Sequence, residues 1–388
     1  MKSEWKECTI ADLGDVVTGK TPSTKASEFW DGAINFVTPK DIQGLKHITK
    51  TERRITEAGL QKVKGAILPP QAVCVSCIGN IGYTGMTSQR CVSNQQINSI
   101  IVNDDNDPDF VYYLIRNLWP FFKSYEGQST TLSILNKTQF SKISVTVPDK
   151  TTQIRIAAIL SSIDEKIAIN TQINDNLQQQ AQAIFMQRFI TDEIDGDEKP
   201  LYDFADYING AAFKPSECGD HGLPIIKIVE LKNGITDSTK YFDGFKGEKY
   251  LIQDKDILFS WSGNPDTSID IFIWTHGKAI LNQHTFNVRS NTGHRWFTFL
   301  MLKYFKPEFS RIASNKQTTG LGHVTATDLK RLTFIFNEDA IEAFEHEVSP
   351  FMETIYSNMM ENQRLAQLRD TLLPKLMSGA IDVSGIPL

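Results

Sequence analysis

The sequence predicts an α+β protein in which two mixed α/β domains occur in tandem and are separated by two long helices that pack on each other. Two observations predict this architecture. The chain contains an internal repeat of similar blocks, and two helical stretches carry apolar residues at matching heptad positions. The length of 388 residues also suits two or three domains better than one.

The repeat has a period of 184–190 residues. Leu13–Gly19 returns as Phe204–Gly210, and Val73–Asn80 returns as Ile257–Asn264. Short β-branched and aromatic runs between Gly, Pro, Asn and Asp make each repeat mixed α/β. Further matched blocks occur in the same order: Asn94-Gln95 with Asn282-Gln283, Gln128–Thr131 with Gln317–Gly320, and Leu135–Phe140 with Val324–Leu329.

The two helical stretches share an unusual feature. Residues 151–190 contain no Pro and no Gly, and their heptad series includes one Asn, which recurs 188 residues later. An Asn in a helix seam costs stability but fixes register, because its amide requires a polar group on the other helix. In the alternative interpretation, the two stretches are unrelated amphipathic helices and the matching Asn positions are a coincidence. We expect helices of about 40 residues and about 60 Å that pack through Ile156, Ile163, Asn170, Leu177, Ile184, Phe344, Phe351, Asn358, Leu365 and Leu372.

These patterns divide the chain into five segments. They are a domain at 1–150, a spacer helix with its linker at 151–199, a second domain at 200–339, a second spacer helix at 340–378 and a C-terminal tail at 379–388. Gly379, Gly385 and Pro387 predict that the end of the chain, from Lys375 on, frays.

The formal net charge of −6 would by itself argue against nucleic-acid binding, but the location of the charges along the chain matters. Residues 1–150 hold 17 basic and 15 acidic side chains, and residues 200–339 hold 16 of each. Residues 151–199 hold 4 against 8, and residues 340–388 hold 3 against 7, so each helical region carries −4. The excess acid lies on the helices, and the overall charge neither excludes nor supports DNA binding.

Composition also indicates the compartment. The charged first 25 residues contain no secretory apolar segment, and no run is long enough to span a membrane. Five irregularly spaced cysteines suit a reduced, cytoplasmic protein. Cys74 and Cys77 form a CxxC, but it lies in a strand-like run with no second pair, so we expect buried strand residues and no metal site.

The sequence lacks the motifs of common enzymes. It contains no GxxxxGK[ST] phosphate loop, no HExxH and no nucleophile–base arrangement that can be assembled from chain order. Asp220, Glu230 and Lys232 form a loose version of the magnesium-nuclease pattern, which leaves a nuclease as one alternative. We expect a protein without catalytic residues of its own.

Two similar modules held apart by long helices suit the reading of a split DNA site, because equivalent faces on one duplex must be set at a defined distance. Polar loops in each module offer cations for phosphates and amides or hydroxyls for base edges, although ordinary solvated turns have the same composition. A second alternative is a duplicated coiled-coil adaptor without DNA specificity. The candidate DNA-contacting residues are Lys20, Thr21, Ser23, Lys25, Gln128, Ser129, Thr130, Thr131, Ser260, Trp261, Asn264, Lys316, Gln317, Thr318 and Thr319.

The order of blocks resembles the specificity subunit of type I restriction-modification systems. The resemblance covers nearly the whole chain. It rests on Gly19–Ser23, Pro39–Ile42, Gln128–Thr131, Val147-Pro148, Gln153–Asp164 and Leu372–Gly379. The second half departs from the family pattern. Its first loop reads Ala211-Ala-Phe-Lys-Pro215, and its helix begins Ile341-Glu-Ala-Phe-Glu without the Gln.

The resemblance implies two target-recognition domains, one for each half of a split sequence in double-stranded DNA, and an antiparallel coiled coil between them. It also implies a complex with two methyltransferase subunits, which use S-adenosylmethionine, and with restriction subunits, which use ATP and Mg²⁺. Those cofactors belong to the partners, and none is expected in this chain. Candidate docking residues at the helix ends are Phe185, Met186, Phe189, Leu376 and Met377, unless these ends pack on the recognition domains.

Overall fold

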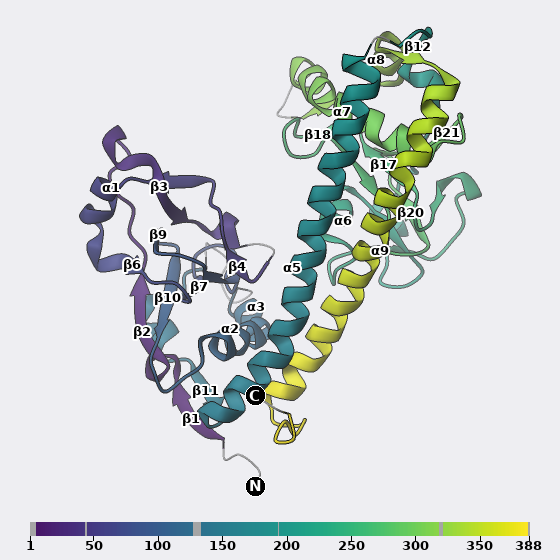
Figure 1. The fold of residues 1–388 in the computed structure, drawn as a ribbon. Coiled ribbons are helices and arrows are strands. Elements are labelled where there is room, and N and C mark those ends of the chain that lie inside the picture. Colours follow the sequence, from purple (N-terminus) through teal and green to yellow (C-terminus); the bar gives the residue numbers. More distant parts are fainter. Residues whose placement is uncertain (1–4, 43–44, 127–132, 193, 318–320, 387–388) are drawn as a thin grey trace. The chain divides into compact units, whose positions relative to one another are not determined.

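The computed structural model describes residues 5–42, 45–126, 133–192, 194–317 and 321–386. The chain forms two compact units. Unit 1 consists of residues 1–169 and 362–388, and unit 2 consists of residues 170–361. The long helices α5 (Lys150–Met186) and α9 (Glu338–Met377) each contribute residues to both units (Figure 1).

Unit 1 contains a five-stranded sheet of order β2-β10-β7-β8-β4, a four-stranded sheet of order β5-β3-β9-β6 and the pair β1-β11. Its strands are β1 Lys6–Thr9, β2 Gly14–Thr18, β3 Trp30–Val37, β4 His47–Ile48, β5 Arg53–Ile55, β6 Ile67–Leu68, β7 Val73–Ser76, β8 Thr84–Thr87, β9 Cys91–Ser93, β10 Ile97–Val102 and β11 Ser144–Val147. Its shorter helices are α1 Glu57–Lys62, α2 Pro108–Asn117, α3 Trp119–Glu126 and α4 Lys137–Ser141.

Unit 2 contains sheets of order β13-β21-β17-β19 and β15-β14-β20-β16, and the pairs β12-β23 and β18-β22. Its strands are β12 Asp197–Pro200, β13 Ala205–Asn209, β14 Leu223–Ile226, β15 Tyr241–Phe242, β16 Leu251–Ile252, β17 Ile257–Ser260, β18 Ser262–Gly263, β19 Asp270–Ile273, β20 Ala279–Leu281, β21 Thr285–Ser290, β22 Gly322–His323 and β23 Thr333–Phe336. Its shorter helices are α6 Ile228–Asn233, α7 Arg295–Asn315 and α8 Ala326–Arg331.

The two units have the same topology, which confirms the predicted tandem repeat. The order β2-β10-β7-β8 in unit 1 corresponds to β13-β21-β17-β19 in unit 2, and β5-β3-β9-β6 corresponds to β15-β14-β20-β16. Both second sheets contain one parallel pair, β3 with β9 and β14 with β20. The helices before the last strands even begin alike, because Asn136 and Gln139 form a capping box on α4, and Thr325 and Asp328 form one on α8.

The CxxC pair lies where the strand-like sequence places it. Cys74 belongs to β7 and Cys77 follows that strand, and both side chains are buried. Burial raises the pKa of the Cys74 thiol to about 11 and that of Cys77 to about 12, so both remain protonated at neutral pH. Among the described residues, no three His, Cys, Asp or Glu side chains gather closely enough to hold a metal ion.

Helices α5 and α9 run antiparallel within each unit. In unit 1, Arg369 Nη1 donates to Asp164 Oδ1 at 2.7 Å. In unit 2, Asn358 Nδ2 donates to Asn174 Oδ1 at 2.9 Å, and Asn170 Nδ2 donates to Glu361 Oε2 at 2.7 Å. Each seam Asn therefore bonds a polar side chain on the opposite helix.

The proposed seam residues differ in how deeply they are buried. Four are buried: Ile156, Ile163, Asn170 and Phe344. The other six are half-buried: Leu177, Ile184, Phe351, Asn358, Leu365 and Leu372. Most of the apolar seam residues also pack on the domain cores: Leu372 packs against the core of unit 1, and Leu177, Ile184 and Phe351 pack against the core of unit 2. Ile156 belongs to the core of unit 1, and Phe344 belongs to the aromatic core of unit 2.

Of the two alternatives for the helix ends, docking of a partner or packing on the domains, the structure supports packing for most of the candidate residues. Of the candidate docking residues, only Met186 is exposed, at 40%. The remaining four are Phe185, Phe189, Leu376 and Met377, and they are buried within the cores of the units. The helix ends therefore pack on the two domains. No helix of the described residues is both long enough and apolar enough to cross a membrane.

The C-terminal segment, expected to fray, packs on unit 1. Gly379, with φ +69°, ends α9, and a Cβ at this position would approach Trp5 Nε1 to 2.8 Å. Val383 is 4% exposed within the unit 1 core, and Arg155 Nε donates to Ile386 O at 3.0 Å. The prediction of fraying relied on the two glycines and the proline and gave too little weight to the apolar residues of the segment.

We predict that Val383→Ala destabilises unit 1 by about 2 kcal/mol, because it leaves a cavity in a packed core. Thermal or urea unfolding followed by a probe in unit 1 measures the change. The exposed Ser384→Ala serves as the matched control and should change stability by less than about 0.5 kcal/mol. If Val383→Ala and wild type had the same free energy of unfolding, the segment would not contribute to the core.

Candidate nucleic-acid interface

The loop after β2 is held against the turn before β10. Gly19 N donates to Ile97 O at 3.0 Å, and Thr21 Oγ1 donates to Gln95 Oε1 at 2.5 Å. This loop therefore has a defined position at one end of the five-stranded sheet. Three predicted DNA-contacting residues of the loop are exposed: Lys20, Ser23 and Lys25.

A third segment adjoins the same turn. Cys77 N donates to Gln96 O at 2.7 Å, and Leu135 N donates to Cys77 O at 2.8 Å. Ile78 also bridges Ile134. The predicted residues Gln128, Ser129, Thr130 and Thr131 lie outside the described residues. The segment that follows them is nevertheless placed beside the 94–96 turn.

Unit 2 repeats this arrangement. Ala211, after β13, bridges Asn282, and Gln283 N donates to Ala211 O at 2.9 Å. β18 pairs with β22, as Ile78 pairs with Ile134 in unit 1. In each unit, therefore, four segments that are separated in sequence form one loop cluster. We call these loop cluster 1 (residues 19–25, 77–80, 94–96 and 133–135) and loop cluster 2 (residues 209–214, 261–264, 282–284 and 322–324).

Trp261 is the central aromatic residue of loop cluster 2. It is half-buried, its ring stacks on Phe286 with centroids 5.5 Å apart, and its Nε1 donates to Asn209 Oδ1 at 3.2 Å. Asn264 is exposed, while its Oδ1 accepts from the backbone amides of Asp266 and Thr267. Both predicted residues thus lie at the surface of the cluster, with part of their hydrogen-bonding capacity used to hold its shape.

Ser260 is wrongly assigned to the DNA-contacting set. It lies in β17 and is 0% exposed, so a ligand cannot reach its hydroxyl. The repeat explains the burial, because the corresponding Ser76 in β7 is also fully buried. Ser76 Oγ donates to Asn80 O and accepts from Tyr83 N, which stabilises the turn after the strand.

Lys316 is committed to a protein contact. Its Nζ lies 2.5 Å from Asp328 Oδ2, and the Asp328 carboxylate also accepts from Thr325 N and Oγ1. Burial opposes ionisation of Asp328, but the hydrogen bonds from Lys316 and Thr325 outweigh it and lower the pKa of this carboxyl. The neighbouring Gln317 is exposed, and Thr318 and Thr319 lie outside the described residues.

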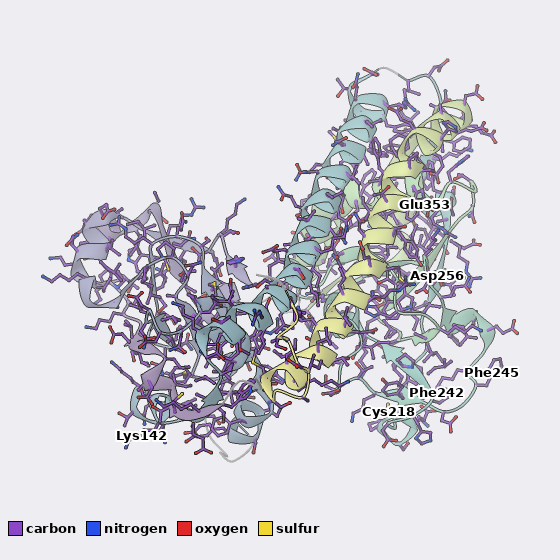
Figure 2. The ribbon with its side chains drawn as sticks, turned by 60° about the horizontal axis from the view of Figure 1, so that its bottom comes forward. Lys142, Cys218, Phe242, Phe245, Asp256 and Glu353 are labelled. Atoms are coloured by element: carbon purple, nitrogen blue, oxygen red, sulfur yellow. The ribbon has the colours of Figure 1, made fainter. Side chains whose placement is uncertain are left out.

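Some surface residues of the clusters were not in the predicted set. Gln95 in unit 1 and Gln283 and His284 in unit 2 are exposed on the turns that hold the clusters together. The recurrence of Asn-Gln in both repeats was a signal for them. Phe245, on the loop after β15, is 75% exposed and is labelled beside Phe242 in Figure 2. No repeat pattern marked it, because unit 1 has helix α1 after β5.

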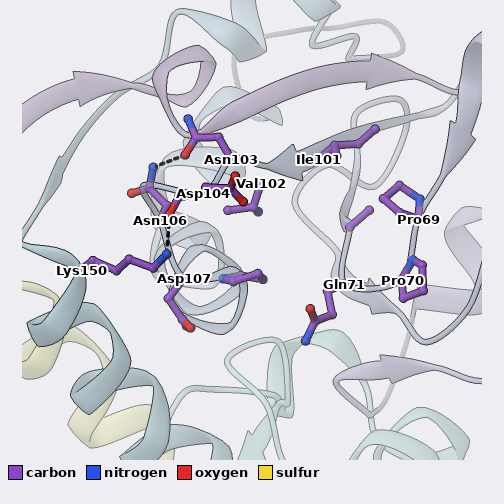
Figure 3. Close-up of a pocket in the computed structure, with 12 residues that line it drawn as sticks. Pro69, Pro70, Gln71, Ile101, Val102, Asn103, Asp104, Asn106, Asp107 and Lys150 are labelled. Carbon is purple, nitrogen blue, oxygen red and sulfur yellow. Dashed lines mark hydrogen bonds between the residues drawn. The ribbon is translucent and has the colours of Figure 1, made fainter.

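A cavity of about 320 Å³ in unit 1 lies apart from the predicted residues (Figure 3). Lys150 from α5 donates to Asp104 O at its edge, and Asn106 Nδ2 donates to Asn103 Oδ1. Burial raises the pKa of Asp107, whose carboxylate caps α2. The carboxylates of Asp104 and Asp107 line the cavity, and its lysine, Lys150, is already bonded to Asp104 O. The cavity therefore does not suit a nucleic-acid phosphate.

The proposed nuclease triplet does not form a metal site. Glu230 is 5% exposed, and its carboxylate accepts from Lys227 N at 3.0 Å as part of the start of α6. Lys232 Nζ donates to Thr267 O. Asp220 is exposed and bonds His221 at 2.9 Å. These roles are structural, so the nuclease alternative is not supported.

Two equivalent loop clusters on a duplicated fold define a binding protein with two related recognition surfaces. Comparison with known proteins identifies its family. The chain belongs to the family described by the type I restriction modification DNA specificity domain, whose model matches residues 2–179 and again residues 193–369. Specificity subunits of these systems are not enzymes, because catalysis resides in the modification and restriction subunits. This membership does not favour the adaptor alternative.

Individual relatives agree with this assignment. The specificity subunit of the type I restriction enzyme MjaIX from Methanocaldococcus jannaschii is 26% identical over 98% of this chain and 94% of the relative. That of HindI from Haemophilus influenzae is 30% identical over 49% of this chain and 42% of the relative. The S subunit structure of a type I restriction-modification system from M. genitalium is similar in fold, with a TM-score of 0.56, 15% identity and 96% of each chain covered.

We predict that Lys316→Met acts on stability and not on DNA affinity. The ion pair between partly exposed Lys316 and buried Asp328 should account for about 1 kcal/mol at pH 7. Because the pKa of Asp328 is lowered in the folded state, its contribution is present above the unfolded pKa of about 3.9 and is lost as pH falls through the folded pKa. The difference between variant and wild type should therefore shrink below about pH 4.

Urea unfolding at pH 7 and pH 3 measures this difference. DNA binding at several salt concentrations tests the second half of the prediction. A phosphate-binding lysine would reduce the slope of log affinity against log salt by about 1 on removal. Such a reduction in Lys316→Met would contradict the structural role.

Proposed function

We propose that this chain reads a split sequence in double-stranded DNA, with loop cluster 1 contacting one half-site and loop cluster 2 the other. The observation that carries the proposal is the equivalence of the clusters. Four equivalent segments adjoin at corresponding strand ends in both units, on sheets that share four strands in the same order. Their side chains differ, which suits recognition of two different half-sites.

The chemistry of the clusters suits a duplex. Lys20 and Lys25 are exposed and offer charge for phosphates, whereas Gln95 and Gln283 offer amides that donate to and accept from base edges. Trp261 provides a rigid aromatic surface beside Asn264. Positioning by phosphate contacts and selection by base contacts can therefore both come from one cluster.

We further propose that the helix pair sets the gap between the half-sites. Support comes from the continuity of α5 and α9, each of which contributes residues to both units. Polar bonds such as those of Asn170 and Asn358 fix the register of the pair, and a fixed register is required of a spacer.

The partners proposed for this chain are two methyltransferase subunits and restriction subunits. S-adenosylmethionine, ATP and Mg²⁺ would act in those partners. With most helix-end residues buried, the surfaces left for docking are exposed apolar side chains along the helices. Among the described residues they include Ile169, Ile173, Met186 and Leu368.

The decisive experiment is co-expression with a cognate methyltransferase subunit, followed by sequencing of methylated bases in the host DNA. We expect a motif of two specified parts separated by a fixed unspecified gap. A contiguous motif, or none, would overturn the proposal.

Cationic contacts can be tested separately. The double variant Lys20→Ala, Lys25→Ala should reduce the slope of log affinity against log salt by about 2, because each lost phosphate contact releases about one fewer counterion. Lys142→Ala is the matched control, since Lys142 is exposed but precedes β11 outside loop cluster 1. If Lys142→Ala changed the salt dependence as much as the double variant does, Lys20 and Lys25 would not be specific phosphate contacts.

The spacer role predicts a change in gap length. Inserting four residues into α5 near Asn174, with a matching insertion in α9 near Asn358, should lengthen the helix pair by about 6 Å. At about 3.4 Å per base pair, the gap should grow by one or two base pairs while both half-sites keep their sequences. An unchanged gap in the methylated motif would show that the helices do not set it.

A further inference from the structure

Lys46 is a buried cation at the junction between the recognition domain of unit 1 and its helices. Its side chain is 6% exposed, although burial of a charge is costly unless the charge is paired and hydrogen-bonded. The Nζ atom lies 2.6 Å from Asp109 Oδ1 on α2 and 2.8 Å from Ser161 Oγ on α5. It also lies 4.8 Å from the ring centroid of Tyr113.

The contacts of Lys46 are part of a larger network. Tyr113 donates from its hydroxyl to Asp164 Oδ2 at 2.6 Å, and Arg369 Nη1 donates to Asp164 Oδ1 at 2.7 Å. Asp164 is itself 8% exposed. The network therefore joins the recognition domain through Lys46 and Tyr113 to α5 and then to α9, all within unit 1.

Unit 2 is attached to its helix segments differently. The positions 188 residues from Asp164 and Arg369 are Met352 and Ala181, and both are buried in the aromatic core that contains Phe185. β4, which directly follows Lys46, extends the five-stranded sheet of unit 1, whereas the corresponding sheet of unit 2 has four strands among the described residues.

A lysine also reaches the helix in unit 2, but at the surface. Lys255 Nζ lies 2.7 Å from Glu353 Oε2 on α9, and these side chains are 32% and 47% exposed. Figure 2 labels Glu353 on this helix. A solvated pair of this kind contributes little to stability or orientation. Lys255 is therefore not an equivalent of Lys46. Glu345 of α9 does accept from Trp296 N and Phe297 N in unit 2, but these bonds join a carboxylate to backbone amides and involve no buried cation.

We infer that Lys46 is a positioning residue, which fixes the orientation of the recognition domain on the helices of unit 1 and thereby restricts the gap that the protein accepts in DNA. Apolar contacts are non-directional, whereas a buried charge must keep its partners at defined distances and angles. One base pair of gap shifts a half-site by about 3.4 Å and rotates it by about 34°. A small pivot of the domain is therefore enough to admit a different gap. The inference rests on the proposed function.

The test uses Lys46→Met in the complex with its methyltransferase subunits. Met keeps most of the buried volume, and Asp109, whose side chain is 35% exposed, can be solvated. Binding is measured on duplexes with the natural gap and with gaps one base pair shorter and longer. We expect the preference for the natural gap to fall at least tenfold, while base preference within each half-site is unchanged. Lys255→Met is the matched control and should keep the preference.

Tyr113→Phe is the second variant, because it removes one hydroxyl of the network and leaves every buried cation in place. It should lower the gap preference in the same direction, and it provides the measurement if Lys46→Met does not fold. Folded variants with the wild-type gap preference would overturn the inference, as would an equal loss in Lys255→Met. If the wild type itself recognises no split site, the proposed function fails instead, so the two failures are distinguishable.

Discussion

The packing of α5 against α9 is the constraint on which the rest of the structure depends. Neither unit is complete with one helix, because residues of both lie in each core. Ile156 and Leu376 belong to the core of unit 1, and Phe185 and Phe344 belong to that of unit 2. The helices therefore form part of both domain cores and also connect the domains. Polar bonds from the seam asparagines fix the register of the two helices.

Duplication preserved the sheet order in the two units but not the chemistry that attaches each sheet to the helices. Gln153 illustrates the divergence. In unit 1 its amide bonds Asn106 and Pro148 and accepts from Asp107 N. The residue 188 positions later is Ile341, which is fully buried among apolar side chains. Backbone pairing tolerates such exchanges, since strand order depends on the hydrophobic pattern and not on particular side-chain bonds.

Much of the fold could be predicted from the sequence because it rests on periodicity. The heptads and the recurring blocks revealed the two helices and the tandem domains, and the single Asn in each series revealed their packing. The candidate site was harder to predict from the sequence. Ser260 lies in a block that matches well between repeats, but the match does not reveal that every residue of the central strand β17 is buried. Lys316 has the composition of a phosphate contact, and only the three-dimensional position of Asp328 shows its partner.

The C-terminal segment was misjudged for a related reason. Its glycines and proline are typical of a flexible tail. Val383, Ile381 and Ile386 nevertheless pack on the core of unit 1, and the Arg155 side chain donates to the backbone carbonyl of Ile386. Lys46 was equally hidden, because nothing in the local sequence distinguishes a buried lysine from a solvated one. Its partners Asp109 and Ser161 are 63 and 115 residues away.

The discontinuity of unit 1 has a consequence for biosynthesis. Unit 2 consists of one uninterrupted stretch, residues 170–361, whereas unit 1 requires residues 362–388 in addition to its N-terminal part. Domains generally fold as units while the chain leaves the ribosome. The first part of unit 1 must therefore wait until residues 362–388 have been translated before its core closes, and a chain terminated before these residues lacks a complete first domain.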